Sequence, residues 1–285
     1  MTELKFPGGL SEIADRYDAV LCDVWGVIHN GRAAFDAACD ALVRFREGGG
    51  KVCLITNAPV PKQQVIDYFE PLGVPAAAYD DCVSSGDATR EELQRRKDQV
   101  FWRMGVNSRW ERDPFLYEGL DLSFGEPEEA DVLLCVGLRD SLNDHPSDYA
   151  DEMRPGVDRN IPMICANPDK QVRIGGKLHW CAGALAEIHK DYGGEVVYGG
   201  KPHAPIYRLA FAAAEKARGC DIDTTRVLAL GDGLKTDILG ANRAGIGAVL
   251  VTGAGGVHDA DGDGLELHLD RAGVHVLAAM EGLQW

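Results

Sequence analysis

A short apolar run, residues 19–22, ends on an aspartate, Asp23, and a glycine, Gly26, follows three residues later. Apolar runs of this length, bounded by turn residues, are typical of the buried strands of parallel sheets. Open α/β sheets bind their ligands at the carboxyl ends of such strands. Asp23 is therefore a candidate site residue, although an aspartate that closes a strand is also common as a simple turn residue.

The rest of the chain repeats a strand-then-helix rhythm, which indicates an α/β fold. We expect strands at 51–55, 81–83, 195–198, 226–230 and 248–251, and helices at 33–47, 88–97 and 205–218. From about residue 99 a second set of elements intervenes, with strands expected at 101–105, 120–124, 130–138 and 161–166 and helices at 148–159 and 180–192. This pattern predicts a core domain of residues 1–98 and 196–285 and an inserted domain of residues 99–195.

Charge and cysteine usage exclude several classes of protein. The 285 residues carry a net charge of −16, which argues against a nucleic-acid partner or an anionic membrane surface, because both need clustered positive charge. The eight cysteines form no CxxC pair, so neither a zinc site nor a disulfide framework is indicated. Without a signal peptide or a membrane-length apolar run, we expect a cytoplasmic protein.

The acidic tail matches the spacing of a calcium loop at Asp259, Asp261 and Asp263. Glu266 stands where such a loop needs an apolar residue, and the twelfth position is Asp270 rather than a glutamate. We therefore interpret this segment as a solvated acidic loop.

Polar residues follow several of the predicted strands or open the next helix. They are Asp23, the pair Thr56-Asn57, Lys201, and the pair Asp232 and Asp237. In a parallel sheet these positions collect on one edge. Carboxylates crowded there repel one another unless a divalent cation neutralises them, and lysine and threonine add a fixed positive charge and a hydroxyl donor. Such a set suits a phosphoryl group.

The order of these residues resembles a known family. Asp23-x-x-Gly26-Val27, Thr56-Asn57, Gly200-Lys201-Pro202 and Gly231-Asp232-x-x-x-Thr236-Asp237 together resemble the haloacid dehalogenase-like hydrolase superfamily. The insertion, with Ala166-Asn167-Pro168-Asp169 and Ala182-Gly183-Ala184-Leu185, is similar to that of its class IIA, which includes nucleotide, pyridoxal-phosphate and p-nitrophenyl phosphatases. The resemblance implies a Rossmann-like parallel-sheet core with a large inserted α/β cap domain.

The resemblance also implies roles for individual residues. Asp23 would be the nucleophile that forms an aspartyl-phosphate, and Thr56, Lys201 and the backbone N–H of Asn57 would hold the phosphoryl oxygens. Mg²⁺ would be bound by Asp23, Asp232 and the backbone carbonyl of Trp25, with support from Asp237. Gly26 in the core and Asn167 and Asp169 in the cap would contribute to substrate binding.

Trp25 departs from the family pattern, because phosphatases of this family carry a second aspartate at that position. The replacement removes the side-chain general acid/base, a role worth about 10²–10⁴-fold in rate. Three interpretations stay open: a phosphohydrolase of small phosphorylated metabolites, an inactive binding or regulatory protein, and a dehalogenase-like enzyme. Either His29 or His203 could replace the missing group, although an exposed loop histidine is the simpler interpretation of each.

We expect the cap residues to select a small phosphorylated substrate. The cap is also a candidate surface for a homodimer. An arginine-rich segment (Arg95, Arg96, Arg103, Arg109 and Arg112) would suit an anion, but Arg95 and Arg96 fit a solvated helix face with Glu91 and Glu92 better. His179 and Trp180 are candidates to line the same cleft, and a packed tryptophan is an equal alternative.

Overall fold

A computed structural model describes residue 5 and residues 7–105, 114–253 and 264–285. The chain forms two compact units: a first unit of Met1–Thr56, Ile66–Val83 and Lys201–Trp285, and a second unit of Asn57–Val65 and Ser84–Gly200. The domain boundaries predicted at residues 98 and 196 stay a prediction. Arg109, Arg112 and residues 259–263 of the predicted acidic loop lie outside the described residues. The later part of that predicted loop is instead helical, because Glu266 and Asp270 lie in α9 (Leu265–Ala272).

The first unit is built on a six-stranded sheet in the order β13-β12-β11-β1-β2-β3. Its strands are β1 (Ala19–Asp23), β2 (Lys51–Thr56), β3 (Asp81–Ser84), β11 (Val227–Gly231), β12 (Gly247–Val251) and β13 (Ala278–Met280). Neighbouring strands pair in parallel from β13 to β12, from β12 to β11, from β11 to β1 and from β1 to β2. All five residues of β1 are buried, because helices cover both faces of a parallel sheet.

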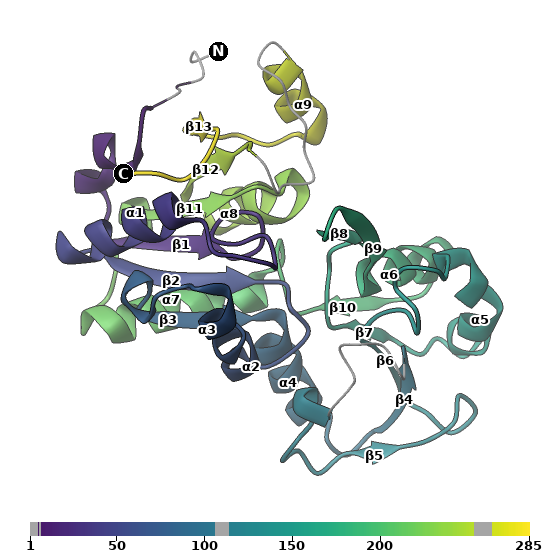
Figure 1. The fold of residues 1–285 in the computed structure, drawn as a ribbon. Coiled ribbons are helices and arrows are strands. Elements are labelled where there is room, and N and C mark those ends of the chain that lie inside the picture. Colours follow the sequence, from purple (N-terminus) through teal and green to yellow (C-terminus); the bar gives the residue numbers. More distant parts are fainter. Residues whose placement is uncertain (1–4, 6, 106–113, 254–263) are drawn as a thin grey trace. The chain divides into compact units, whose positions relative to one another are not determined.

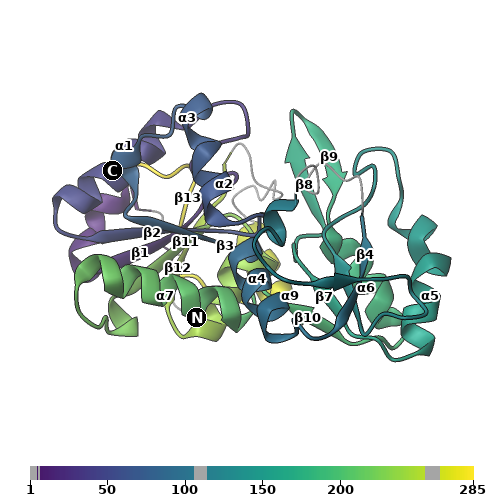
Figure 2. The same ribbon diagram turned by 90° about the horizontal axis from the view of Figure 1, so that it is seen from below.

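Figures 1 and 2 show α1 (Asp36–Glu47) and α7 (Ala204–Arg218) on opposite faces of this sheet. Alternate residues of β1, such as Ala19 and Leu21, pack with Ile206 and Ala210 of α7 in one apolar cluster. The unit's shorter elements are α3 (Phe69–Leu72), α8 (Leu239–Ala244), α9 (Leu265–Ala272), 3₁₀ turns at Leu10–Glu12, Ala14–Arg16, Ala76–Ala78 and Thr224–Arg226, and a π-helix at Leu234–Ile238. Helix α2 (Lys62–Asp67) joins the two units along the chain.

The second unit contains a five-stranded sheet in the order β10-β7-β6-β4-β5. Its strands are β4 (Val100–Met104), β5 (Ser123–Phe124), β6 (Val132–Cys135), β7 (Met163–Cys165) and β10 (Val196–Tyr198), all paired in parallel. Leu93 of α4 (Ser85–Arg95) packs on one face. Met153 of α5 (Ala150–Asp158) and Leu185 of α6 (Ala182–Asp191) pack on the other. A separate antiparallel hairpin is formed by β8 (Gln171–Ile174) and β9 (Lys177–Trp180), and 3₁₀ turns lie at Pro114–Leu116 and Pro146–Tyr149.

The predicted α/β architecture is confirmed, and several local expectations are corrected. The strand expected at 120–124 is only β5, and the sheet continues past the strand at 248–251 with β13, which was not predicted. The helix expected at 180–192 begins at Ala182, because Trp180 closes strand β9. Helix α4 begins at Ser85 rather than residue 88, because the Ser84 hydroxyl accepts the Asp87 N–H and the Asp87 side chain accepts the Ser84 N–H.

Among the described residues, no helix is both long enough and apolar enough to cross a membrane. The eight cysteines are free thiols, and seven of them are buried. They pack as small apolar side chains, as expected for cysteines inside strand-like runs.

Candidate active site

The carboxyl edge of the first unit's sheet gathers the predicted residues of that unit. Strand β1 ends on Asp23, its neighbour β2 ends on Thr56, and β11 on the other side ends on Gly231, directly before Asp232. The register sets Asp23 opposite Ile55, so the strand ends lie side by side. Asp23 and Thr56 are both buried. Parallel pairing of apolar strands therefore brings residues more than 170 positions apart to one edge.

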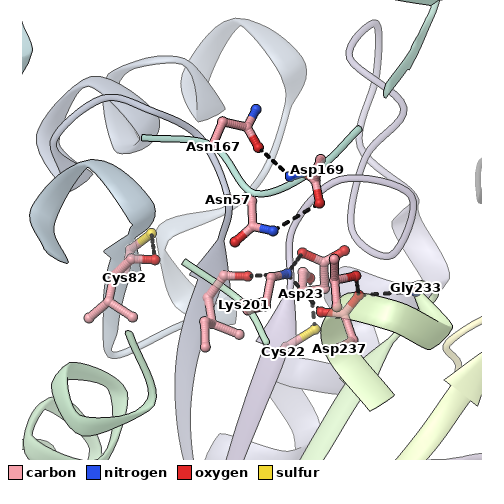
Figure 3. Close-up of polar contacts among 12 residues, drawn as sticks. Cys22, Asp23, Asn57, Cys82, Asn167, Asp169, Lys201, Gly233 and Asp237 are labelled. Atoms are coloured by element: carbon pink, nitrogen blue, oxygen red, sulfur yellow. Dashed lines mark hydrogen bonds and ion pairs between the residues drawn. The ribbon is translucent and has the colours of Figure 1, made fainter. Parts of the chain in front are cut away.

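Lys201 lies between two of the carboxylates (Figure 3). Its ammonium nitrogen Nζ is 2.5 Å from Asp23 Oδ1, 2.7 Å from Asp237 Oδ1 and 3.1 Å from the backbone oxygen of Ile55. The side chain is 3% exposed. Three acceptors match the three protons of an ammonium group, so this buried lysine is fully hydrogen-bonded as a cation.

Asp237 is held by a local structure that the sequence pattern did not predict. It lies in the π-helix at Leu234–Ile238, in which the Ile238 N–H donates to the Gly233 carbonyl five residues earlier. Its Oδ2 accepts the Gly233 N–H at 3.0 Å. A Cβ on Gly231 would lie 2.3 Å from the Asp237 Cβ, so only glycine permits this close approach. π-Helical turns are frequent at functional sites.

The electrostatics of the cluster favour an additional cation. Burial raises the pKa of Asp23 to about 7, repulsion from Asp237 adds to the rise, and Lys201 opposes it. One lysine thus leaves two buried carboxylates incompletely neutralised. Asp23, Asp232 and Asp237 each offer an oxygen within 4.8 Å of the others, a spacing that a hexacoordinate oxygen-ligated ion such as Mg²⁺ fits.

Trp25 and Gly26 belong to a tight turn that follows β1. Gly26 has a positive φ of 84°, and its N–H donates to the His29 carbonyl at 2.8 Å. The Trp25 ring lies over Gly31, because a Cβ on Gly31 would be only 2.3 Å from ring atom Cη2 of Trp25. The Trp25 ring also meets the His29 ring edge-to-face, with ring centroids 5.2 Å apart. The Trp25 ring therefore packs within the turn.

His29 is not the exposed loop residue that the simpler interpretation expected. It is buried, and its ring also meets Tyr68 and Phe69 edge-on. Its Nδ1 accepts the Gly31 N–H at 3.0 Å. Burial lowers the pKa of His29 to about 4, so the ring is neutral at pH 7 and supports the turn. His203 is partly exposed and is the N-cap residue of α7.

The second unit holds the predicted residues Asn57, Asn167 and Asp169 in one chain of hydrogen bonds (Figure 3). Asn57 Nδ2 donates to Asp169 Oδ1 at 2.8 Å, and the Asp169 N–H donates to Asn167 Oδ1 at 3.0 Å. A Cβ on Gly183 would lie 2.2 Å from the Pro168 carbonyl oxygen, which explains the glycine at the start of α6. The two cap sequence segments thus pack against each other.

The remaining cap candidates have structural partners. Arg95 pairs with Glu91 and Glu92, and Arg96 pairs with Glu92, so the predicted charge pairs of this helix form. Arg95 is exposed, whereas Glu92 and Arg96 are only partly exposed. Arg103 donates to the Tyr117 hydroxyl at 3.0 Å and lies over the Phe124 ring.

On the hairpin, the His179 ring lies 3.0 Å from the Ser141 hydroxyl, and Trp180 meets His145 edge-on. Trp180 also packs against the second unit's core, which favours the packed interpretation of this tryptophan.

Comparison with known proteins agrees with this geometry. The family model described as haloacid dehalogenase-like hydrolase matches residues 20–115, and a second, described as HAD-hydrolase-like, matches residues 198–277. A solved haloacid dehalogenase-like hydrolase from Brucella suis is 41% identical, with a TM-score of 0.82 over 87% of this chain and 93% of that one.

Two further relatives cover nearly the whole chain. The ribonucleotide monophosphatase NagD of Escherichia coli is 28% identical over 85% of this chain and 90% of its own. A p-nitrophenyl phosphatase from Archaeoglobus fulgidus shares the fold, with a TM-score of 0.69 at 21% identity over 93% of this chain and 96% of that one. Because the Brucella suis hydrolase is 41% identical over most of both chains, the chain belongs to the haloacid dehalogenase-like hydrolase family and is of the class IIA type that its sequence predicted.

Proposed function

We propose that this hydrolase is a Mg²⁺-dependent phosphatase of a small phosphorylated metabolite and acts through an aspartyl-phosphate on Asp23. The observation that carries the proposal is the buried cluster in which Lys201 joins Asp23 to Asp237, with Asp232 completing a set of three carboxylates. The E. coli relative, named a ribonucleotide monophosphatase, supports a phosphate monoester as the substrate class.

In the first step, a carboxylate oxygen of Asp23 attacks phosphorus, and the bond from phosphorus to the substrate oxygen breaks. Water then attacks phosphorus, which releases inorganic phosphate and restores the Asp23 carboxylate. Lys201 and Thr56 stabilise the negative charge on the phosphoryl oxygens during both steps. Asp23, Asp232 and the Trp25 carbonyl would hold Mg²⁺, which supplies further positive charge, while Asp237 positions Lys201.

Trp25 determines which substrates react well. Tryptophan, at the position two residues after the nucleophile, has no side-chain group that ionises near neutral pH, so it cannot act as the general acid for a leaving alkoxide. The neutral, turn-bound His29 does not supply it either. Aryl phosphates need little protonation as they leave, whereas alkyl phosphates should react about 10²–10⁴-fold more slowly. The substrate-binding roles of Asn57, Asn167, Asp169 and Gly26 stay a prediction within this proposal.

A phosphate-release screen over phosphorylated metabolites, with and without Mg²⁺, tests the proposal. Mg²⁺-dependent release should be found, and titration calorimetry should show a divalent site that is lost in Asp232→Ala. Asp221→Ala, an exposed aspartate of the same unit, is the matched control and should keep the site. An unchanged isotherm in Asp232→Ala would remove the metal assignment, and binding of phosphorylated compounds without release would favour a binding protein.

A further inference from the structure

The first unit contains a cavity of about 630 Å³ beside α7 and α8 that the proposed chemistry does not use. Small-molecule sites commonly fall between about 300 and 1,000 Å³. Its lining combines basic and apolar side chains and includes His203, Arg208, Phe211, Ala212, Glu215 and Arg243. None of these residues belongs to the carboxylate cluster.

The charges around the cavity favour an anion. Two arginines, Arg208 and Arg243, line it against one carboxylate, although the whole chain carries a net charge of −16. That carboxylate, on Glu215, accepts the Ile222 N–H at 3.4 Å and keeps its charge, so the lining carries more positive than negative side chains. The N-terminus of the 15-residue helix α7 also opens on the cavity at His203, and helix N-termini favour negative charge.

The rest of the lining favours an apolar body on that anion. Phe211 and Ala212 of α7 and Ala244 of α8 provide an apolar wall. Tyr207 and Gly240 form another part of the lining. They pack closely, because a Cβ added to Gly240 would lie only 2.3 Å from the Tyr207 hydroxyl oxygen. That hydroxyl donates to the backbone carbonyl of Asp237 at 3.2 Å, so this wall is hydrogen-bonded to the π-helix.

We propose that this cavity is a binding site for a small organic anion, in which an acidic group meets Arg208 and Arg243 and an aromatic or aliphatic body packs on Phe211. The site is separate from the reaction centre, so the inference does not depend on the proposed phosphatase activity.

Anilinonaphthalene sulfonate is a suitable probe, because it joins an anionic group to an aromatic body and fluoresces when it leaves water. Titration of the full chain should show saturable binding at one site. Arg208→Gln and Arg243→Gln should each weaken it about tenfold, since each removes a charge-assisted hydrogen bond. Ala212→Phe should block it by filling the cavity from the exposed side of α7.

Two controls identify the site. Lys216→Gln removes an exposed positive charge from α7 outside the cavity and should leave the affinity unchanged. Asp23→Asn should also leave it unchanged, which separates this site from the reaction centre. The inference is overturned if no saturable binding is found, if both arginine variants bind as the wild type does, or if Asp23→Asn abolishes binding.

Discussion

Replacement of Lys201 by methionine should destabilise the metal-free protein more than any other single change in the cluster. The side chains of Lys201, Asp23 and Asp237 are 3%, 7% and 5% exposed. Methionine keeps most of the apolar stem but removes the ammonium group that bonds both carboxylates. Two buried aspartates are then left without their counter-charge.

The loss of one partner from a buried ion pair costs about 3–5 kcal/mol, because the remaining charge stays desolvated. For a folding unit of this size, a loss of that magnitude lowers Tm by about 10 °C. We expect this shift in calorimetry of Lys201→Met at neutral pH in the presence of EDTA. Mg²⁺ should recover part of the loss, because the cation neutralises the same carboxylates.

Asp23→Asn is the matched comparison and should shift Tm in the opposite direction or leave it unchanged. It removes one of two like charges that repel each other and keeps an oxygen that accepts from Lys201. A Lys201→Met variant that melts within about 2 °C of the wild type, a difference below about 1 kcal/mol, would show that the ammonium group is not the needed counter-charge. A loss of stability in Asp23→Asn as large as that in Lys201→Met would show the same.

Three further predictions concern other parts of the chain. Trp25→Asp should narrow the gap of about 10²–10⁴-fold between aryl and alkyl phosphate rates; equal wild-type rates would show that another acid exists. Tyr207→Phe, which removes the hydrogen bond to Asp237, should lower kcat about two- to tenfold at unchanged KM; a rise in KM alone would contradict a positioning role. Asp80→Asn should cost about 1–3 kcal/mol at pH 7 in urea unfolding, because Asp80 binds Arg46 and the Val52 N–H. Burial raises the pKa of Asp80, but Arg46 and the Val52 N–H together outweigh burial and hold this pKa below its usual value. The stabilisation should therefore disappear as pH falls below about 4, and a pH-independent difference would contradict it.

The sequence predicted the strand ends because their information is local. An apolar run that stops at Asp23 or Thr56 identifies a buried strand and its polar terminus without any knowledge of the fold. Parallel pairing then brings those termini to one edge, as the register of β1 with β2 and β11 confirms.

Long-range packing could not be predicted in the same way. The burial of His29 depends on Trp25, Tyr68 and Phe69, and no spacing in the sequence indicates that these rings meet. The π-helix around Asp237 depends on Gly231 and Gly233 allowing close approach, and two glycines near an aspartate also suit an ordinary turn. The predicted homodimer through the cap stays a prediction.

Hydride trapping can show whether Asp23 carries the phosphoryl group during turnover. Borohydride added during turnover with an aryl phosphate and Mg²⁺ reduces an acyl-phosphate to an alcohol, so an aspartyl-phosphate becomes homoserine. Mass spectrometry of the peptide that contains residue 23 should show homoserine in place of Asp23 only when substrate is present. Aspartate left intact at Asp23 during measured turnover, or homoserine at another aspartate, would contradict the account.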